Sequence, residues 1–176
     1  MIRDATPIER LFAGHRADNP NGRLLVLGRP PGKVTLNLEG WERIACVAAS
    51  DEELRPGTVR ADPHHLPFHE ALFDKALLSA DLVQPRLMLR ELWRVLAPAG
   101  LAVLVVRARR PWHIKDIGWL RDPLQLRLDE TMFEVIDWRV ETLPERYHVV
   151  LVAKRDWQKP VLVGEADPAL VPRIVN

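Results

Sequence analysis

Short runs of apolar residues divide this chain, and they show no alternation of apolar and polar positions. They span residues 23–28 (RLLVLG), 43–49 (RIACVAA), 73–83 (FDKALLSADLV) and 101–108 (LAVLVVRA). A continuous apolar run of this length is typical of a strand buried on both faces, as in a parallel sheet covered by helices. The runs therefore predict an α/β fold built on a mostly parallel sheet.

A helix is predicted between the third and fourth runs, over residues 85–100 (PRLMLRELWRVLAPAG), where apolar residues fall at helical spacing on one face. Arginines recur every fourth residue on the other face, and we expect this basic stripe to be a solvated helix surface. Proline and glycine after Leu96 end the helix. The arginines are Arg86, Arg90 and Arg94.

The two ends of the chain carry further signals. Residues 133–142 and 146–154 are extended runs on either side of a short turn, which predicts an antiparallel hairpin. Near the N-terminus, Thr6, Pro7 and Glu9 form a helix start signal with a capping box. The last stretch is punctuated by prolines, so we expect one domain over residues 1–158 and an irregular tail over 159–176.

Composition limits the classes of function. The 176 residues suffice for one domain with a proper core. A formal net charge of +1 implies no overall attraction to nucleic acid or to a membrane surface. The single cysteine, Cys46, lies in an apolar run and is expected to be a reduced thiol, which fits a cytoplasmic protein. No apolar run approaches the roughly 18 residues that span a bilayer, and the charged N-terminus does not resemble a signal peptide.

An ordered set of short motifs runs through the middle of the chain. It consists of Asp62, Leu66-Pro67-Phe68, Phe73-Asp74, Glu91, Arg94-Val95-Leu96 and Pro98-Ala99-Gly100. The set resembles the class I, Rossmann-like S-adenosylmethionine-dependent methyltransferases of the small-molecule type, over residues 23–108. The resemblance implies a seven-stranded sheet whose last strand is antiparallel. It also implies a cofactor at the carboxyl ends of the first strands, at the topological switch point.

The cofactor loop departs from the family pattern. In the family the first strand ends in an acidic residue and is followed by Gly-x-Gly-x-Gly; here Val26 replaces the acid, and Pro30 replaces the middle glycine between Gly28 and Gly32. Proline fixes its own backbone torsion and lacks an N–H donor, and Pro31 adds a second constraint. We therefore predict a stiff loop with few donors.

The second strand departs in the same way. Ala48 stands where the family carries the acid that binds the ribose hydroxyls. The acids at 51–53 come later and suit the first turn of a helix; the alternative is that one of them reaches back to the ribose. The stretch from Gly32 to Ile44 contains no convincing helix, so the helix that normally follows the glycine loop is expected to be truncated.

The residues on the adenine side of the implied cofactor site follow the family pattern more closely. Asp62 matches the family acid that accepts a hydrogen bond from the adenine amino group. The alternative is that Asp62 caps a turn at a strand end. By the resemblance, the residues lining a cofactor site would be Gly28, Arg29, Gly32, Asp62, Pro63, His64 and Ser79.

No catalytic base is identifiable, and Asp81 and His113 are weak candidates. Methyl transfer depends chiefly on holding two groups in line, so a missing base does not decide the question. The histidines at 64, 65 and 69 lack further ligands for a metal site. Residues 107–115 (RARRPWHIK) have the composition of a surface for an acidic partner or nucleic acid, but the small net charge favours a plain surface.

Two hypotheses follow. The first is a non-catalytic methyltransferase-like protein with weak or absent S-adenosylmethionine binding, which acts as a scaffold for a protein partner. That partner would be a second copy or an active methyltransferase homologue, and neither a membrane nor nucleic acid is expected. The second is an active methyltransferase with an altered cofactor pocket. A nicotinamide dehydrogenase shares the fold class but explains none of the later motifs and also needs the ribose acid.

Overall fold

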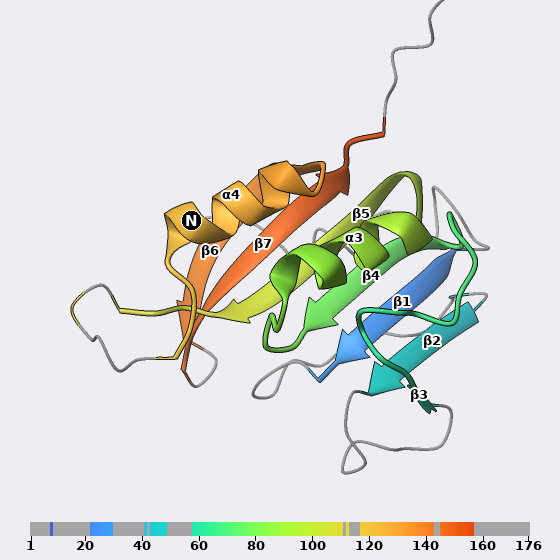
Figure 1. The fold of residues 1–176 in the computed structure, drawn as a ribbon, viewed down its shortest axis with the longest axis horizontal. Coiled ribbons are helices and arrows are strands. Elements are labelled where there is room, and N and C mark those ends of the chain that lie inside the picture. The colour runs from blue at the N-terminus through green and yellow to red at the C-terminus, as the bar shows by residue number, and fades with distance from the viewer. Residues whose placement is uncertain are drawn as a thin grey trace, which may run out of the picture.

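The computed structural model describes residues 8, 22–29, 41, 43–48, 58–110, 112, 117–142 and 145–156. Within them, seven strands form one sheet in the order β3-β2-β1-β4-β5-β7-β6, covered by the helices α3 and α4 (Figure 1). The elements are β1 (Arg23–Gly28), β2 (Arg43–Ala48), β3 (Thr58–Arg60), β4 (Phe73–Ser79), α3 (Pro85–Val95), β5 (Leu96–Arg107), α4 (Arg121–Glu130), β6 (Phe133–Thr142) and β7 (Arg146–Lys154).

The direction of the strands confirms the predicted fold class. Strands β1 to β5 pair in parallel, whereas β7 is antiparallel to both β5 and β6. The chain builds the sheet outward from β1 to β3 and then crosses to the other side of β1 to add β4. The strand order therefore reverses between β1 and β4, which is where open α/β sheets bind ligands.

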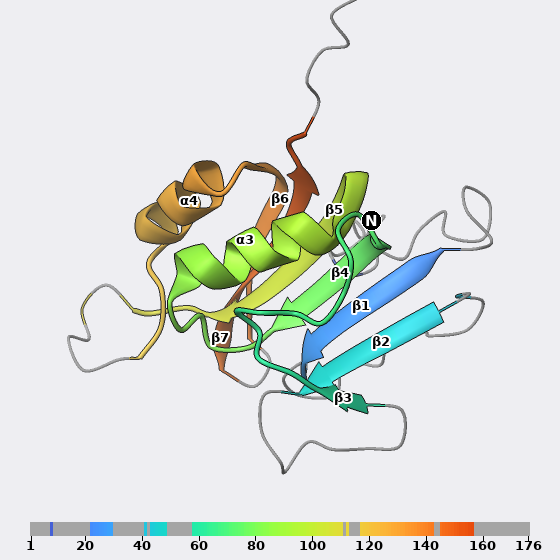
Figure 2. The same ribbon diagram turned by 45° about the vertical axis from the view of Figure 1, so that its right-hand side comes forward.

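Both described helices lie on the same face of the sheet, as two views show (Figures 1 and 2). Helix α3 buries Met88, Leu89, Leu92 and Val95 against it. The opposite face carries a second apolar cluster, which includes Leu77, Val103, Val105, Val149 and Leu151. Each fully buried side chain of this size contributes about 1.5–3 kcal/mol to folding, so apolar packing on both faces explains why the strands are nearly uniformly apolar.

The strands and the terminal hairpin occur where they were predicted, with one change at the end of α3. The helix ends at Val95, and Leu96 already begins β5. The register along β4 shifts there, because Phe73 pairs with Leu96 and Lys75 pairs with Leu101. Ala99 lies in the shifted segment with a φ of 56°. The APAG segment thus forms an irregularity inside a strand rather than a loop before it.

Two elements were not predicted, β3 and α4. In α4, Leu124, Leu126 and Leu128 alternate with polar residues, a pattern that favours a strand. The helix instead buries Leu124 and Leu128, which are four residues apart, and leaves the side chain of Leu126 54% exposed. Strand β3 has three residues, too few for a periodic signal.

A buried histidine ties the terminal hairpin to the segment that leads into α4. Trp138 Nε1 donates a hydrogen bond to Nδ1 of His148, at 3.1 Å. The proton of the neutral ring is therefore on Nε2, which donates to the carbonyl oxygen of Trp119 at 3.0 Å. Burial lowers the pKa of His148, so the neutral ring is the form that fits.

Several predictions from the sequence lie outside the described residues. These are the helix over 6–14 apart from Ile8, which is helical, the loop residues Pro30, Pro31 and Gly32, the acids at 51–53, and the tail over 159–176. Among the helices that the structure describes, none combines the length and apolar character needed to cross a membrane.

Candidate functional site

Four strands bring the predicted cofactor residues to one edge of the sheet. Gly28 ends β1 and pairs with Ser79, which ends β4. Ala48 ends β2 and pairs with Arg60, which ends β3, two residues before Asp62. Since these strands are parallel, all their carboxyl ends meet at this edge. The structure therefore brings Gly28, Arg29, Ser79 and the 62–64 segment to the predicted edge.

Gly28 and Ser79 are held by each other at the switch point. Gly28 has a φ of 73°, and a Cβ atom there would collide with the backbone carbonyl oxygen of Ser79. Ser79 is buried, and its hydroxyl donates to the carbonyl oxygen of Arg29 at 3.0 Å. Only glycine accommodates both the left-handed torsion and this close approach. The packing of β1 on β4 thus requires Gly28, and the hydroxyl of Ser79 fixes the start of the next loop.

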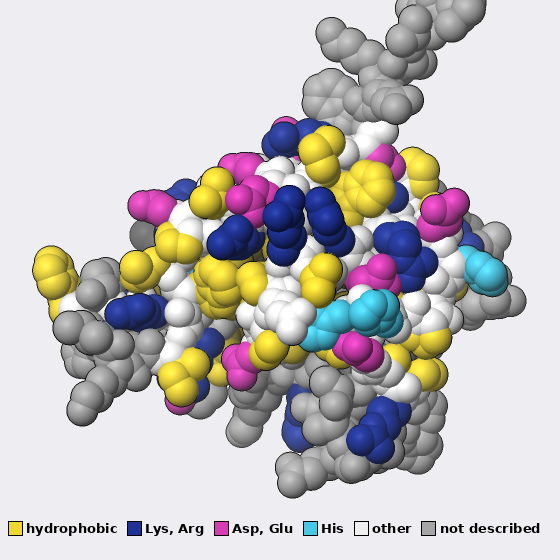
Figure 3. Space-filling view, in the orientation of Figure 1, with side chains coloured by type: hydrophobic (Ala, Val, Ile, Leu, Met, Phe, Trp, Pro, Cys, Tyr) yellow, Lys and Arg dark blue, Asp and Glu magenta, His cyan; other side chains and the backbone are white. Residues whose placement is uncertain are grey.

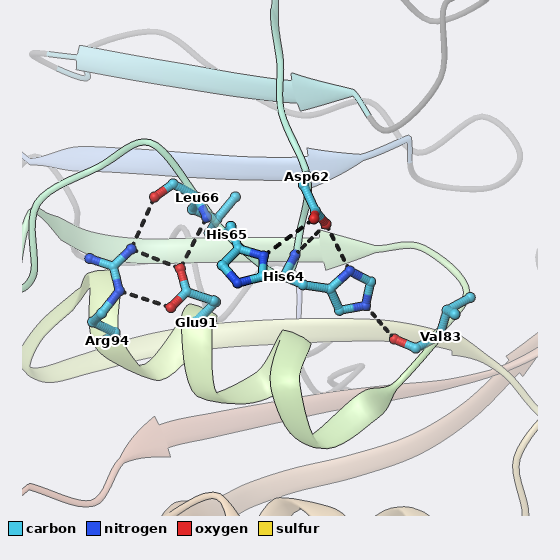
Figure 4. Close-up of polar contacts among 7 residues, drawn as sticks. All are labelled: Asp62, His64, His65, Leu66, Val83, Glu91 and Arg94. Carbon is cyan, nitrogen blue, oxygen red and sulfur yellow. Dashed lines mark hydrogen bonds and ion pairs between the residues drawn. The ribbon is translucent and has the colours of Figure 1, made fainter.

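The carboxylate of Asp62 is engaged by its own turn (Figure 4). Its Oδ1 accepts from the backbone N–H of His64 at 2.9 Å and lies 2.7 Å from Nδ1 of the same histidine. Its Oδ2 lies 3.3 Å from Nδ1 of His65. The backbone bond, followed by the ring bond, holds the pKa of Asp62 down to about 2. Asp62 does cap a turn, which is the alternative weighed from the sequence.

The imidazole of His64 bridges two loops of this edge (Figure 4). Its Nδ1 faces the Asp62 carboxylate, and its Nε2 lies 2.7 Å from the carbonyl oxygen of Val83 in the loop after β4. A neutral ring can donate from one nitrogen only, whereas the protonated ring donates from both. The carbonyl of Val83, and then the Asp62 carboxylate, raise the pKa of His64. The geometry therefore fits an imidazolium that connects the loop after β3 to the loop after β4.

A second polar cluster joins the same loop to helix α3. The guanidinium of Arg94 binds both carboxylate oxygens of Glu91, at 2.9 and 2.8 Å. It also donates to the carbonyl oxygens of Phe68 at 2.7 Å and Leu66 at 3.0 Å, while the N–H of Leu66 donates to Glu91 at 3.0 Å. The prediction that Arg94 belongs to a solvated stripe is therefore wrong. Its side chain folds back onto the loop, whereas Arg86 and Arg90 are exposed as expected.

Comparison with known proteins identifies the architecture. No protein-family model matches the sequence, and no curated protein matches it significantly. A SAM-dependent methyltransferase from Methanosarcina mazei matches in structure with a TM-score of 0.62 and 20% identity, over 80% of this chain and 95% of that one. A second match is the Burkholderia thailandensis 1,6-didemethyltoxoflavin-N1-methyltransferase, which was solved with 1,6-didemethyltoxoflavin and S-adenosylhomocysteine bound. It matches with a TM-score of 0.60 and 19% identity, over 87% of this chain and 80% of that one. The chain has the class I methyltransferase fold.

A third structure with the methyltransferase fold is solved together with another protein. It is a candidate methyltransferase from Haloferax volcanii in complex with the Trm112 methyltransferase activator. It matches with a TM-score of 0.59 and 14% identity, over 81% of this chain and 89% of that one.

The motifs that resemble the methyltransferase family hold the fold together at the amino ends of the strands. Phe68 packs edge-on against Phe73 at the start of β4, with ring centroids 5.0 Å apart. Asp74 accepts a 2.7 Å hydrogen bond from the backbone N–H of Arg23 at the start of β1. These contacts lie at the edge of the sheet opposite Gly28. The Glu91–Arg94 cluster joins the loop after β3 to the end of α3. These motifs, apart from Asp62, therefore hold helix α3, the loop after β3 and the starts of β1 and β4 together.

The described residues of the cofactor edge fit an adenosyl ligand poorly. Val26 is buried in mid-strand, between Cys46 and Leu77, and offers no acceptor. Ala48 ends β2 without a carboxylate, and the oxygens of Asp62 already have partners. Of the weak catalytic candidates, Asp81 is exposed in the loop after β4, and His113 lies outside the described residues. Among the residues that the structure does describe, no group of three or more potential ligands could hold a metal ion.

We expect His64 and His148 to titrate on opposite sides of the ordinary histidine value of about 6.5. His64 gains acceptors on folding, so its pKa is raised, and the stability that it contributes is present below 6.5 and lost as the pH rises through the folded value. His148 is buried, so its pKa is lowered, and its contribution is present above 6.5 and lost as the pH falls toward the folded value. Histidine NMR titration measures both.

The matched variant for this titration is Asp62→Asn. It removes the negative charge beside His64 and leaves the Val83 carbonyl in place, so the pKa of His64 should fall while that of His148 stays unchanged. If His64 titrates at or below 6.5 in the native protein, the imidazolium bridge is wrong.

Proposed function

We propose that this chain is a scaffold with the methyltransferase fold, which binds S-adenosylmethionine weakly or not at all and acts through a protein partner instead of catalysing methyl transfer. The observation that carries the proposal is the state of Asp62. It is the remaining acid at the cofactor edge that matches the family pattern, and its two oxygens serve His64 and His65. A ligand amino group bound there would have to share these oxygens with the two histidines.

The magnitudes support weak binding. A lost charge-assisted hydrogen bond costs about 1.5–3 kcal/mol, and about 1.4 kcal/mol changes a dissociation constant tenfold. The chain lacks the ribose acid at Ala48 and the first-strand acid at Val26, and Asp62 is engaged by its own turn. Together these changes move a micromolar site to the millimolar range or beyond.

Calorimetric titration of the purified full chain with S-adenosylmethionine and S-adenosylhomocysteine tests the proposal. We expect no measurable binding below about 1 mM for either ligand. The matched variant is Ala48→Asp, which returns a carboxylate to the end of β2 and should tighten binding by about tenfold or more. Micromolar binding by the unmodified chain would reject the scaffold proposal.

An active methyltransferase with an altered pocket is the second candidate. One observation favours it, because Asp62 follows β3 at the expected place and its side chain is 55% exposed, so a ligand amino group could reach it. Micromolar binding of either ligand in the same titration supports this candidate.

A scaffold needs a partner, and we propose a protein partner in the cytoplasm. The Haloferax volcanii complex supports this choice, because a protein of the same fold was solved there with a protein activator. A second copy of this chain and an active methyltransferase homologue are both candidates.

A further inference from the structure

The exposed side of helix α3 carries an apolar residue, Leu87, and a second exposed apolar residue, Val83, lies just before the helix. The buried side of α3 contains Met88, Leu89, Leu92 and Val95. On the outer side, the side chain of Leu87 is 45% exposed, and Val83, just before the helix, is 60% exposed. Arg86 and Arg90 lie on the same exposed side. We call the four residues Val83, Arg86, Leu87 and Arg90 the α3 stripe.

The two arginines of the α3 stripe differ from Arg94 in their surroundings. Arg94 is held by Glu91 and two loop carbonyls. Within the part of the chain that the structure describes, neither Arg86 nor Arg90 forms an ion pair, and the first turn of α3 contains no acidic residue. Two guanidinium groups one helical turn apart are thus presented to solvent without internal anions. Figure 3 shows Lys and Arg side chains over α3, with hydrophobic side chains among them and acidic side chains over α4.

A second exposed apolar group lies at the same edge of the sheet. Trp119 bridges to Ala108 directly after β5, so the segment leading into α4 lies at the carboxyl end of β5. Within it, Ile117 is 72% exposed and Leu120 is also exposed. The α3 stripe begins just beyond the carboxyl end of β4, which is the parallel neighbour of β5. The two apolar groups therefore flank the edge at which the first turn of α3 begins.

The chemistry of these groups defines what they would bind. Aliphatic side chains favour a protein segment over nucleic acid, because nucleic acids offer stacking faces and few aliphatic groups. Exposed guanidinium groups bind carboxylates in strong bidentate pairs. An amphipathic helix presents apolar anchors at positions i, i+3, i+4 and i+7 to a partner surface. A helix with glutamates beside its apolar face complements both properties.

We propose that the α3 stripe, together with Ile117 and Leu120, is the docking surface for an acidic amphipathic segment of a partner protein. The inference rests on the proposed scaffold function and names the chemistry of its partner. Because the carbonyl of Val83 also accepts the His64 bond, a docked segment would contact the loop that the His64 bridge holds.

The test uses the ¹⁵N-labelled full chain and a synthetic helical peptide of about 18 residues, with leucines on one face and glutamates on its flanks. We expect amide shifts concentrated at Val83, Leu87, Arg90, Ile117 and Leu120. Arg86→Glu and Arg90→Glu should each weaken binding at least tenfold, by replacing attraction with repulsion. Arg155→Glu makes the same change of charge at the opposite edge of the sheet, directly after β7, and should leave the affinity unchanged.

Three outcomes would overturn this docking surface. One is equal binding of a peptide with lysines in place of the glutamates. Another is the same set of amide shifts on adding a single-stranded oligouridylate, which would assign the surface to nucleic acid. The third is the same shifts on raising the protein concentration alone, which would assign it to self-association. Calorimetry with S-adenosylmethionine is a separate measurement, so tight cofactor binding would reject the scaffold function without deciding where the peptide binds.

Discussion

Replacing Arg94 by methionine should lower the free energy of unfolding by about 2 kcal/mol. The substitution keeps the length and apolar stem of the side chain but removes the bonds to Glu91 and to the carbonyl oxygens of Leu66 and Phe68. Glu91 would then keep a half-buried negative charge whose remaining hydrogen bond, among the described residues, comes from the Leu66 N–H. The arginine side chain is 35% exposed, so water recovers part of the loss and the estimate stays at the lower end for such clusters.

The matched control is Arg90→Met, one helical turn earlier. Arg90 is exposed and, among the described residues, forms no hydrogen bond or ion pair, so its substitution should change stability by less than about 0.5 kcal/mol. Urea unfolding measures both variants, and an unchanged m-value would confirm that the difference is one of stability. Hydrogen exchange of the Leu66 amide should accelerate in Arg94→Met alone. Equal effects of the two substitutions would mean that the Glu91–Arg94 cluster does not hold the loop.

The sheet could be predicted because a strand that is buried on both faces is a continuous apolar run in the sequence. Each of the runs at 23–28, 43–49 and 101–108 is apolar at nearly every position, and the structure places each run in the interior of the sheet order. Edge strand β3 and helix α4 contain no such run. A three-residue strand is too short for periodicity, and the alternating leucines of α4 suggest a strand until the fold shows which two of them face the core.

The predicted cofactor residues that the structure describes lie at one edge of the sheet, but their hydrogen bonds could not be predicted from the sequence. Asp62 follows β3, a strand that was not predicted, and it reaches the edge of Gly28 and Ser79 because parallel strands end at a common edge. The contact from His64 to Val83 joins residues 19 positions apart, and no local pattern in the sequence predicts it. The same holds for Arg94, which reaches a loop 26 to 28 residues earlier. Helical periodicity identifies the side of the helix that carries an arginine, but it cannot tell a solvated guanidinium from one that folds back onto the chain.

The residues that resemble the family are of two kinds: those that pack the fold and those that the resemblance assigns to the cofactor. The motifs from Leu66 to Gly100 pack the loop, the start of β4 and helix α3 against one another, so the fold depends on them whatever the protein does. Of the positions that the resemblance assigns to the cofactor, Gly28 and Asp62 match the family pattern, whereas Val26 and Ala48 differ from it. The fold can therefore be retained while individual cofactor positions change.

Gly28 matches the family's cofactor loop, and it tests whether such a match can be explained by the fold alone. Gly28→Ala should lower the free energy of unfolding by about 3 kcal/mol, from a left-handed torsion that costs about 1–2 kcal/mol and a backbone collision of similar cost. The collision is with the Ser79 carbonyl of β4, so the effect arises from strand packing. It should appear in full in urea unfolding of the protein without any added ligand.

Ser79→Ala is the matched variant at the same contact. It leaves the backbone of β4 in place and removes the hydroxyl bond to the Arg29 carbonyl, so the expected loss is about 1 kcal/mol. If Gly28→Ala costs no more than Ser79→Ala, the neighbouring strand tolerates a side chain at position 28. The sheet would then not require the glycine, and its retention would point to a ligand approaching the backbone there, which favours the active methyltransferase over the scaffold. A loss of the predicted size instead explains Gly28 by the fold, with no ligand needed.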